Sequence, residues 1–148
     1  MKHSGGNVFV NTAEEKWMMQ PTKQDSIYQI QSSFEQQSKT VETIKAGIPC
    51  TFKVSVDAYK TNEHVMLEIP IPAGMRVVNK AQQSGATIEY FKQKIVLFFP
   101  KLHQGQQTFY FEMLPNIKGS FMLPAAKCSL MYYPHVYGNN ENKTIEIK

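Results

Sequence analysis

The chain has 148 residues, a length that suits one domain, and 19% of them are charged while 11% are aromatic. Its net charge of +4 is spread along the chain without a basic cluster or stripe, which argues against a nucleic-acid-binding surface. No apolar run approaches the roughly 20 residues of a membrane-spanning helix, and no apolar h-region follows the start MKHSGGN, so no secretory signal is visible.

Residues 1–25 are predicted to form a polar arm, or the stub of a preceding segment, ahead of one β-sandwich domain over residues 26–148. The arm holds one apolar cluster, Trp17-Met18-Met19, just before Pro21. Apolar clusters near chain ends usually dock, so we expect a plug onto the domain's own core. An edge contact, or a stub cut from a neighbouring domain, remains the alternative.

Alternation of apolar and polar residues is the main signal in the rest of the chain. It is clearest from Cys50 to Ala58, where every second residue is apolar. A period of two is typical of a strand with one buried face. The same pattern predicts strands over residues 26–36, 50–58, 64–69, 75–78, 87–91, 93–99, 109–114, 121–123, 127–133 and 143–147, with a short strand or bulge over 41–45.

Turn residues separate these segments every 8–12 positions. Pro70 to Gly74 is predicted to form a fixed corner, since two prolines and a glycine cannot lie inside a central strand. Residues 36–39 should form a polar turn, 79–85 the single plausible helical turn, and 100–107 a connection. Nine to ten short strands with almost no helix predict an all-β fold, an antiparallel β-sandwich.

The two cysteines, Cys50 and Cys128, are too far apart in sequence for a CxxC motif. Each shares the inward parity of its predicted strand. Free buried thiols are the favoured interpretation, because small apolar side chains with this parity lie in the core. A bridge between the two sheets is the alternative.

Groups that could carry catalysis are scattered. The four histidines have no cysteine or carboxylate at metal-ligand spacing, and Glu63 and Glu68 should point to opposite faces of a strand. No nucleophile elbow, phosphate-binding loop or dinucleotide fingerprint is present. We therefore expect a protein that is not an enzyme and has no catalytic residue, metal or cofactor. The histidines are His3, His64, His103 and His135.

A cluster of tyrosines near the end of the chain is the best candidate for a binding function. Tyr133, Pro134 and Tyr137 are expected to form an exposed interaction surface, because tyrosines beside prolines make rigid contact area. Tyr132 has inward parity and is expected to pack at a strand corner with its hydroxyl bonded to the backbone. A carbohydrate-binding platform is a third, weaker option.

Several motifs resemble the last domain of bacterial alpha-2-macroglobulin family proteins of the Bacteroides type. The corner Pro70–Met75 is similar to the family's proline-alanine-glycine corner, and Glu89–Phe99 resembles its central hairpin. Leu102 to Gly105, with the strand from Gln107 to Met113, resembles a passage of the family domain in which leucine-x-x-glycine is followed by an aromatic strand. The closing pattern is similar in order and spacing: Gly119-Ser120-Phe121, Leu123-Pro124-Ala125, Met131-Tyr132-Tyr133-Pro134 and Tyr137-Gly138.

This resemblance covers roughly residues 26–148 and implies a macroglobulin or fibronectin-like, receptor-binding-domain-like sandwich. It implies the C-terminal domain of a large protease-trapping protein, an endopeptidase inhibitor. The domain would dock on its parent's other domains, above all the thioester-type domain, and meet target proteases through the parent. Neither cysteine fits the family's Cys-x-Glu-Gln thioester motif, since Thr51-Phe52 follows Cys50 and Ser129-Leu130 follows Cys128.

The resemblance also implies export of the parent to the periplasm or cell envelope, and association with a penicillin-binding protein. No membrane insertion by this domain is expected. Receptor binding through lysines on a helix, as in animal relatives, is not expected because no such helix is visible. The alternative function is a free-standing envelope adhesin or carbohydrate-binding sandwich that uses the exposed tyrosine patch.

Overall fold

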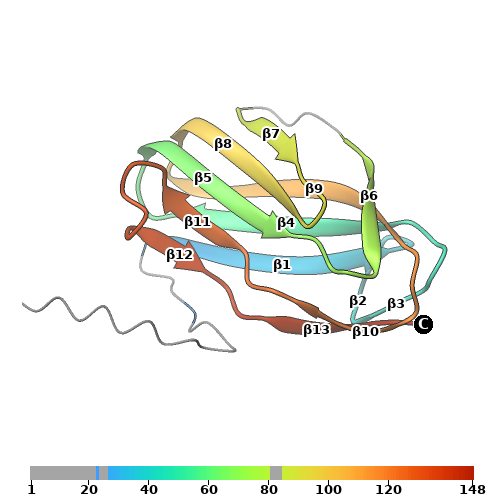
Figure 1. Cartoon of the computed structure of the whole chain (residues 1–148). Coiled ribbons are helices and arrows are strands. Elements are labelled where there is room, and N and C mark those ends of the chain that lie inside the picture. Colours follow the sequence, from blue (N-terminus) through green and yellow to red (C-terminus); the bar gives the residue numbers. More distant parts are fainter. Residues whose placement is uncertain (1–22, 24–26, 81–84) are drawn as a thin grey trace, which may run out of the picture.

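The computed structural model describes residues 23, 27–80 and 85–148, and in these ranges the chain forms thirteen strands and no helix. Two five-stranded sheets face each other and a three-stranded sheet extends one side (Figure 1). The all-β prediction is confirmed. The Trp17-Met18-Met19 cluster of the predicted arm lies outside the described residues, and so do residues 81–84 of the segment expected to hold a helical turn.

The first sheet has the order β2-β1-β4-β9-β6 and is antiparallel throughout. A two-residue turn joins β1 to β2, and both of its residues, Gln37 and Ser38, have positive φ angles of 54° and 64°. Such a turn matches the twist of the strands it connects. The strands are β1 (Tyr28–Gln36), β2 (Lys39–Val41), β4 (Cys50–Ala58), β6 (Met75–Asn79) and β9 (Gly105–Pro115).

The second sheet has the order β12-β11-β5-β8-β7 and is also antiparallel. The predicted central hairpin is present as β7 and β8, which pair from Tyr90 opposite Ile95 outward. The strands are β5 (Asn62–Pro70), β7 (Thr87–Tyr90), β8 (Lys94–Leu102), β11 (Lys127–Leu130) and β12 (Tyr137–Asn139). The strand β12 was not predicted.

The predicted connection over 100–107 is wrong, because β8 continues through Pro100 to Leu102 and β9 already begins at Gly105. Leu102 pairs with Asn62 and is buried, which extends the strand. Pro100 is tolerated because the pairing is interrupted opposite it, at His64, which has a positive φ of 52°. A proline has no N–H to donate and therefore sits at such irregularities.

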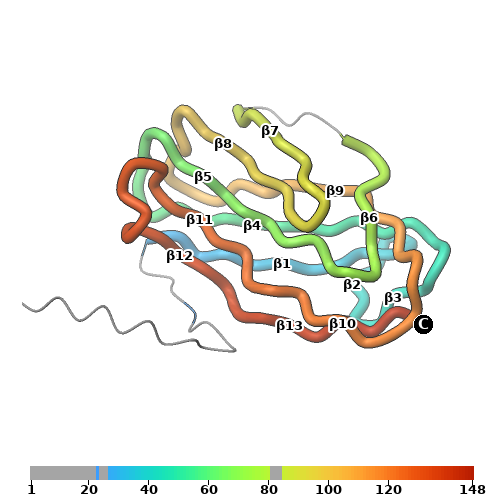
Figure 2. The backbone as a smooth tube through the Cα atoms, viewed as in Figure 1, coloured from blue at the N-terminus to red at the C-terminus, as the bar shows by residue number. Residues whose placement is uncertain are grey.

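The third sheet has the order β10-β13-β3, with β3 (Thr43–Ile44), β10 (Gly119–Leu123) and β13 (Lys143–Ile147). The pair β10–β13 prolongs the pair β11–β12 beyond a break (Figure 2). The backbone of β13 also pairs with β3 in parallel, with Ile147 opposite Ile44. The last strand therefore ties the start of the domain to its end.

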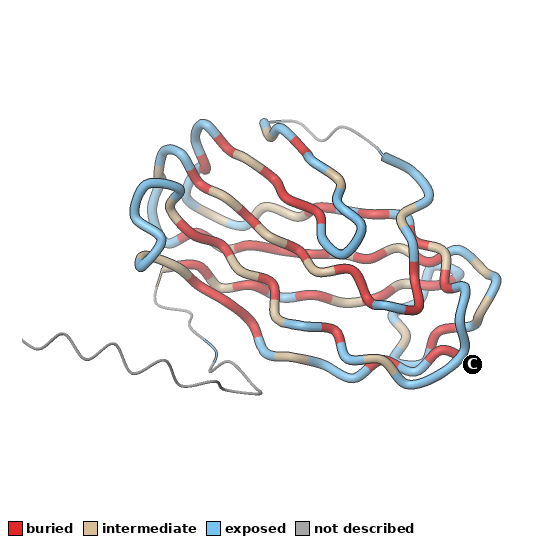
Figure 3. Tube along the Cα trace, in the orientation of Figure 1, coloured by how far each residue is buried: buried red, intermediate tan, exposed pale blue. Residues whose placement is uncertain are grey.

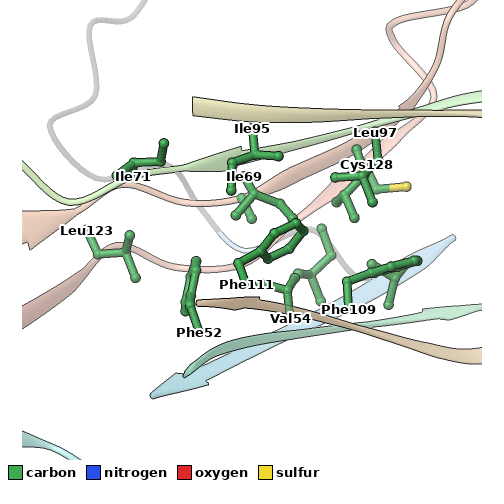
Figure 4. Packing of buried hydrophobic residues seen from close by; sticks show 14 of the residues in the cluster. Phe52, Val54, Ile69, Ile71, Ile95, Leu97, Phe109, Phe111, Leu123 and Cys128 are labelled. Carbon is green, nitrogen blue, oxygen red and sulfur yellow. The ribbon is translucent and has the colours of Figure 1, made fainter. Parts of the chain in front are cut away.

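The core lies between the two large sheets, where the buried faces of their strands meet (Figures 3 and 4). The predicted parity is confirmed on β1, β4 and β9: Phe52 and Phe111 are each 1% exposed, and Tyr28 is fully buried. The rings of Phe34 and Phe52 stack at 4.5 Å between centroids. Full burial of a large apolar side chain stabilises a fold by about 1.5–3 kcal/mol.

Candidate interaction surface

The loop between β11 and β12 carries the predicted contact residues on a closed turn. The amide of Val136 donates to the carbonyl of Tyr133 at 2.9 Å, and the amide of Leu130 donates to the carbonyl of Val136 at 3.1 Å. Pro134 follows the first residue of the Tyr133–Val136 turn, a position for which its fixed φ is suited. The loop therefore has a defined shape.

Tyr132 is 70% exposed, so the expectation that it packs inward is wrong. The strand β11 ends at Leu130, and the alternation of faces ends with it. One more bond to β5 follows, from the amide of Met131 to the carbonyl of His64 at 2.8 Å, and the chain turns away after it, beside the irregularity in β5. The ring of Tyr132 lies edge-on to that of His64, with 5.2 Å between centroids and an interplanar angle of 70°.

The three predicted residues have different environments. Tyr133 is 59% exposed and Pro134 is exposed, as expected, and the ring of Tyr133 makes an edge contact with His135 at 6.1 Å. Tyr137 was expected to be exposed, but it is half-buried on β12, where the ammonium of Lys127 lies 4.7 Å from its ring centroid. A cation over an aromatic face is attracted to it, so this contact holds the Tyr137 ring beside β11.

One more aromatic residue, which sequence reasoning missed, lies at this end of the sandwich. Tyr59 follows β4 in the turn to β5, and it is 49% exposed. That turn and the loop from β11 to β12 project from the same end of the molecule (Figure 1). We call Tyr59, Met131, Tyr132 and Tyr133 the tyrosine end. The sequence gives little sign that Tyr59 belongs to this surface, because the pattern of a single strand does not predict which turns lie together.

The thiols are inert in this fold. Cys50 and Cys128 are both free and buried, as predicted. Burial raises the pKa of Cys50 from its ordinary value near 9.0 to about 11, and it raises the pKa of Cys128 well above the usual range. A thiolate is the reactive form of cysteine. Neither residue therefore has the lowered pKa that a nucleophile needs.

A buried tyrosine also resists ionisation. Burial, and then the nearby Cys128, raise the pKa of Tyr28 to about 12, while a hydrogen bond from Asn62 acts in the opposite direction. The amide of Asn62 donates to the Tyr28 hydroxyl at 3.0 Å. In residues 27–80 and 85–148 there is no group of three His, Cys, Asp or Glu side chains that could hold a metal ion. The described part also has no helix long and apolar enough to cross a membrane.

Two antiparallel sheets packed face to face, with an aromatic loop surface at one end, define an all-β sandwich domain. The family model of the bacterial alpha-2-macroglobulin MG10 domain matches residues 26–135, and the chain belongs to this family. The family expected from the motifs is thereby confirmed. No curated protein matches the chain.

Solved structures of bacterial alpha-2-macroglobulins share the fold. The Salmonella protein reacted with methylamine is similar at a TM-score of 0.75 and 15% identity, over 86% of this chain and 10% of that one. A native Escherichia coli fragment, spanning domain MG7 to the C-terminus, is similar at a TM-score of 0.71 and 16% identity. The match covers 86% of this chain and 24% of that one. The E. coli protein activated by porcine elastase is similar at a TM-score of 0.75 and 15% identity. That match covers 86% of this chain and 14% of the other. The chain thus spans about a tenth of the Salmonella chain and about a quarter of the E. coli fragment.

Proposed function

We propose that this chain is the non-catalytic C-terminal domain of a large, exported alpha-2-macroglobulin-like protein that traps proteases. Its task is to dock on the parent's other domains, in particular a domain of the thioester type, through the tyrosine end. The observation that carries the docking role is the exposure of Tyr132 and Tyr133 on a hydrogen-bonded turn.

The similar structures support the whole-protein part of the proposal. E. coli alpha-2-macroglobulin has been solved after activation by porcine elastase and by trypsin, and both forms contain a domain of this fold. A trap of this kind acts where proteases are met, so we place the parent in the periplasm or cell envelope. Within this chain, the raised pKa values of the two thiols fit a role without covalent chemistry.

The shape and chemistry of the tyrosine end support docking over catalysis. Tyrosine offers a large, rigid contact area with a polar tip, and it is enriched among residues that dominate binding energy. The edge contact between Tyr132 and His64 and the turn at Pro134 hold this area in place before a partner arrives. Preformed surfaces lose less conformational entropy on binding.

The test measures binding between the 148-residue chain and the rest of its parent, taken from the reading frame that encodes them, by calorimetry. The double variant Tyr132→Ala with Tyr133→Ala should bind at least tenfold more weakly. Tyr110→Ala is the matched control, because Tyr110 is 51% exposed on the outer face of the first sheet and should leave affinity unchanged. Equal affinity of the double variant and the unchanged chain would refute docking through the tyrosine end.

Three further outcomes separate the functions. A parent carrying the double variant should capture less elastase after cleavage than the unchanged parent. Binding to a glycan array that disappears in Tyr133→Ala would instead support the carbohydrate-binding alternative. A parent without the domain that captures elastase normally would exclude a part for it in trapping.

A further inference from the structure

A second candidate surface lies at the other end of the sandwich. The nine residues of β5 run from the tyrosine end to the corner at Pro70, a separation of roughly 30 Å. There the corner, β6, the β7–β8 turn and the segment around Met122 enclose a groove of about 750 Å³. In Figure 1 these elements meet on the right, where the β7–β8 turn points towards β6.

The walls of the groove are preformed. The amide of Ile71 donates to the carbonyl of Gln93 at 2.8 Å, which fastens the corner to the β7–β8 turn. That turn is closed by a bond from the amide of Phe91 to the carbonyl of Lys94 at 2.9 Å. The corner itself is closed by a bond of 3.0 Å from the amide of Met75 to the carbonyl of Pro72. A groove built this way needs no folding step to receive a ligand.

The groove combines apolar and cationic lining. Phe91 is 48% exposed and Met122 is 61% exposed, while Ile71 and Met75 are buried beneath. Large exposed apolar side chains that gather in one place mark binding sites. An aromatic ring and a methionine in the lining of one groove suit another large apolar side chain, because the thioether adapts its shape to what it contacts.

The charges of the lining have one sign. Arg76, Lys80 and Lys92 contribute to the groove, and no aspartate or glutamate does. Neither Arg76 nor Lys92 forms an ion pair with another residue of the described ranges. The neighbouring Lys94 is already paired with Glu68 at 2.7 Å, so it contributes less. The rim therefore attracts carboxylates.

We propose that this groove binds an extended acidic protein segment that carries a large apolar side chain. The apolar side chain would lie between Phe91 and Met122, and flanking carboxylates would pair with Arg76 and Lys92. The requirement for both features follows from the lining: the apolar part supplies burial and the carboxylates supply selection by charge. The inference does not depend on the proposed docking at the tyrosine end, which uses other residues at the opposite end.

The probe is a synthetic peptide, Glu-Asp-Glu-Phe-Glu-Asp-Glu, added to the isotope-labelled 148-residue chain and followed by NMR chemical shifts. We expect saturable shifts in residues 70–77 and 90–93, none in the loop 131–136, and a dissociation constant below about 1 mM. Raising NaCl from 50 to 300 mM should weaken binding several-fold, because salt screens exposed charges. Shifts centred elsewhere, or none at 5 mM peptide, would overturn the proposal.

Matched variants separate the two features. The double variant Arg76→Glu with Lys92→Glu should bind at least tenfold more weakly, and Phe91→Ala at least fivefold. Lys101→Glu, an equal charge change per residue at an exposed site further along β8, should have no more than a twofold effect. A peptide with serine in place of phenylalanine should lose most of its affinity. The proposal would be refuted if the serine peptide bound as tightly as the phenylalanine peptide. It would also be refuted if Lys101→Glu lost as much affinity as the double variant, because either result would show unspecific charge attraction.

Discussion

Gly138 on β12 lies against the backbone of Tyr28 on β1, so a strand of one large sheet touches a strand of the other here. A Cβ atom at this position would collide with the carbonyl oxygen of Tyr28, which belongs to the facing sheet. At Gly74 a Cβ atom would come within 2.6 Å of the Phe121 ring. Both glycines belong to motifs that resembled the family, so the structure explains those motifs by close packing.

Gly138→Ala should therefore lower the free energy of unfolding by about 2–3 kcal/mol, the range of overpacked cores. Backbone atoms cannot move aside as the end of a flexible side chain can. Chemical denaturation monitored by circular dichroism measures the change. Gly47→Ala is the control: its φ is 78°, but a Cβ atom there meets nothing within 4 Å, so only about 1 kcal/mol of backbone strain is expected. An equal loss in both variants would contradict the clash.

Single residues were predictable where a strand continues and unpredictable where it stops. Parity placed Phe52, Phe111 and Cys128 in the core, since alternation holds as long as the ladder does. It failed for Tyr132, because β11 ends at Leu130, whose partner Val65 lies next to the irregularity at His64 in a different strand. Information of that kind lies in the pairing of distant segments and is not visible in the residues beside Tyr132.

At the scale of elements, the break between β10–β13 and β11–β12 is bridged by asparagine side chains. The side-chain oxygen of Asn140 accepts from the amide of Ala126 at 2.7 Å, and that of Asn142 accepts from Ala125 at 2.8 Å. Pro124 cannot donate at the break, so side chains replace the missing ladder bonds. The side-chain amide of Asn140 also donates to the Ser32 hydroxyl at 3.3 Å. This bond connects the segment after β12 to β1.

Asn140→Ala should reduce the free energy of unfolding by about 2–3 kcal/mol, because it leaves the amide of Ala126 buried without an acceptor. Asn142→Ala is the matched control and should cost about 1 kcal/mol or less, since water reaches that half-buried site. Urea titrations of the two variants measure the difference. A control that destabilises as much as Asn140→Ala would contradict a role of burial.

Among the elements, hairpins and corners with local signals were predicted and short edge pieces were not. The corner after Pro70 and the hairpin β7–β8 carry proline, glycine and alternation in consecutive residues. The strand β12 has three residues and no apolar alternation, so only its pairing with β11 defines it. The segment expected as a short strand or bulge over 41–45 contributes to two sheets, with Val41 ending β2 and Thr43–Ile44 forming β3.

For the whole molecule, the burial of three weak acids predicts how stability depends on pH. The pKa values of Cys50, Cys128 and Tyr28 are all raised, so the folded state holds these protons more tightly than the unfolded state. Their contribution is complete below about pH 9; its loss begins there with the thiols, and Tyr28 joins from its ordinary value near 10.0 upward. Each such group contributes at most about 1.4 kcal/mol per pH unit between its two pKa values.

The free energy of unfolding should therefore fall steeply between pH 9 and pH 11, as measured by urea titration under reducing conditions. In Cys50→Ala the curve should be flatter over this interval, because one of the titrating thiols is gone. A slope in Cys50→Ala equal to that of the unchanged chain would contradict the link to burial of this thiol.

The pairing of β4 with β9 has a consequence for how the chain reaches this fold. During synthesis the apolar strand Cys50–Ala58 emerges about fifty residues before Gly105–Pro115, its neighbour in the sheet. Pairings between distant segments form slowly, in milliseconds to seconds. A nascent chain that has not yet reached Pro115 therefore exposes the unpaired apolar edge of an incomplete sheet. Any shortened version that ends before this residue will need the protection of a chaperone.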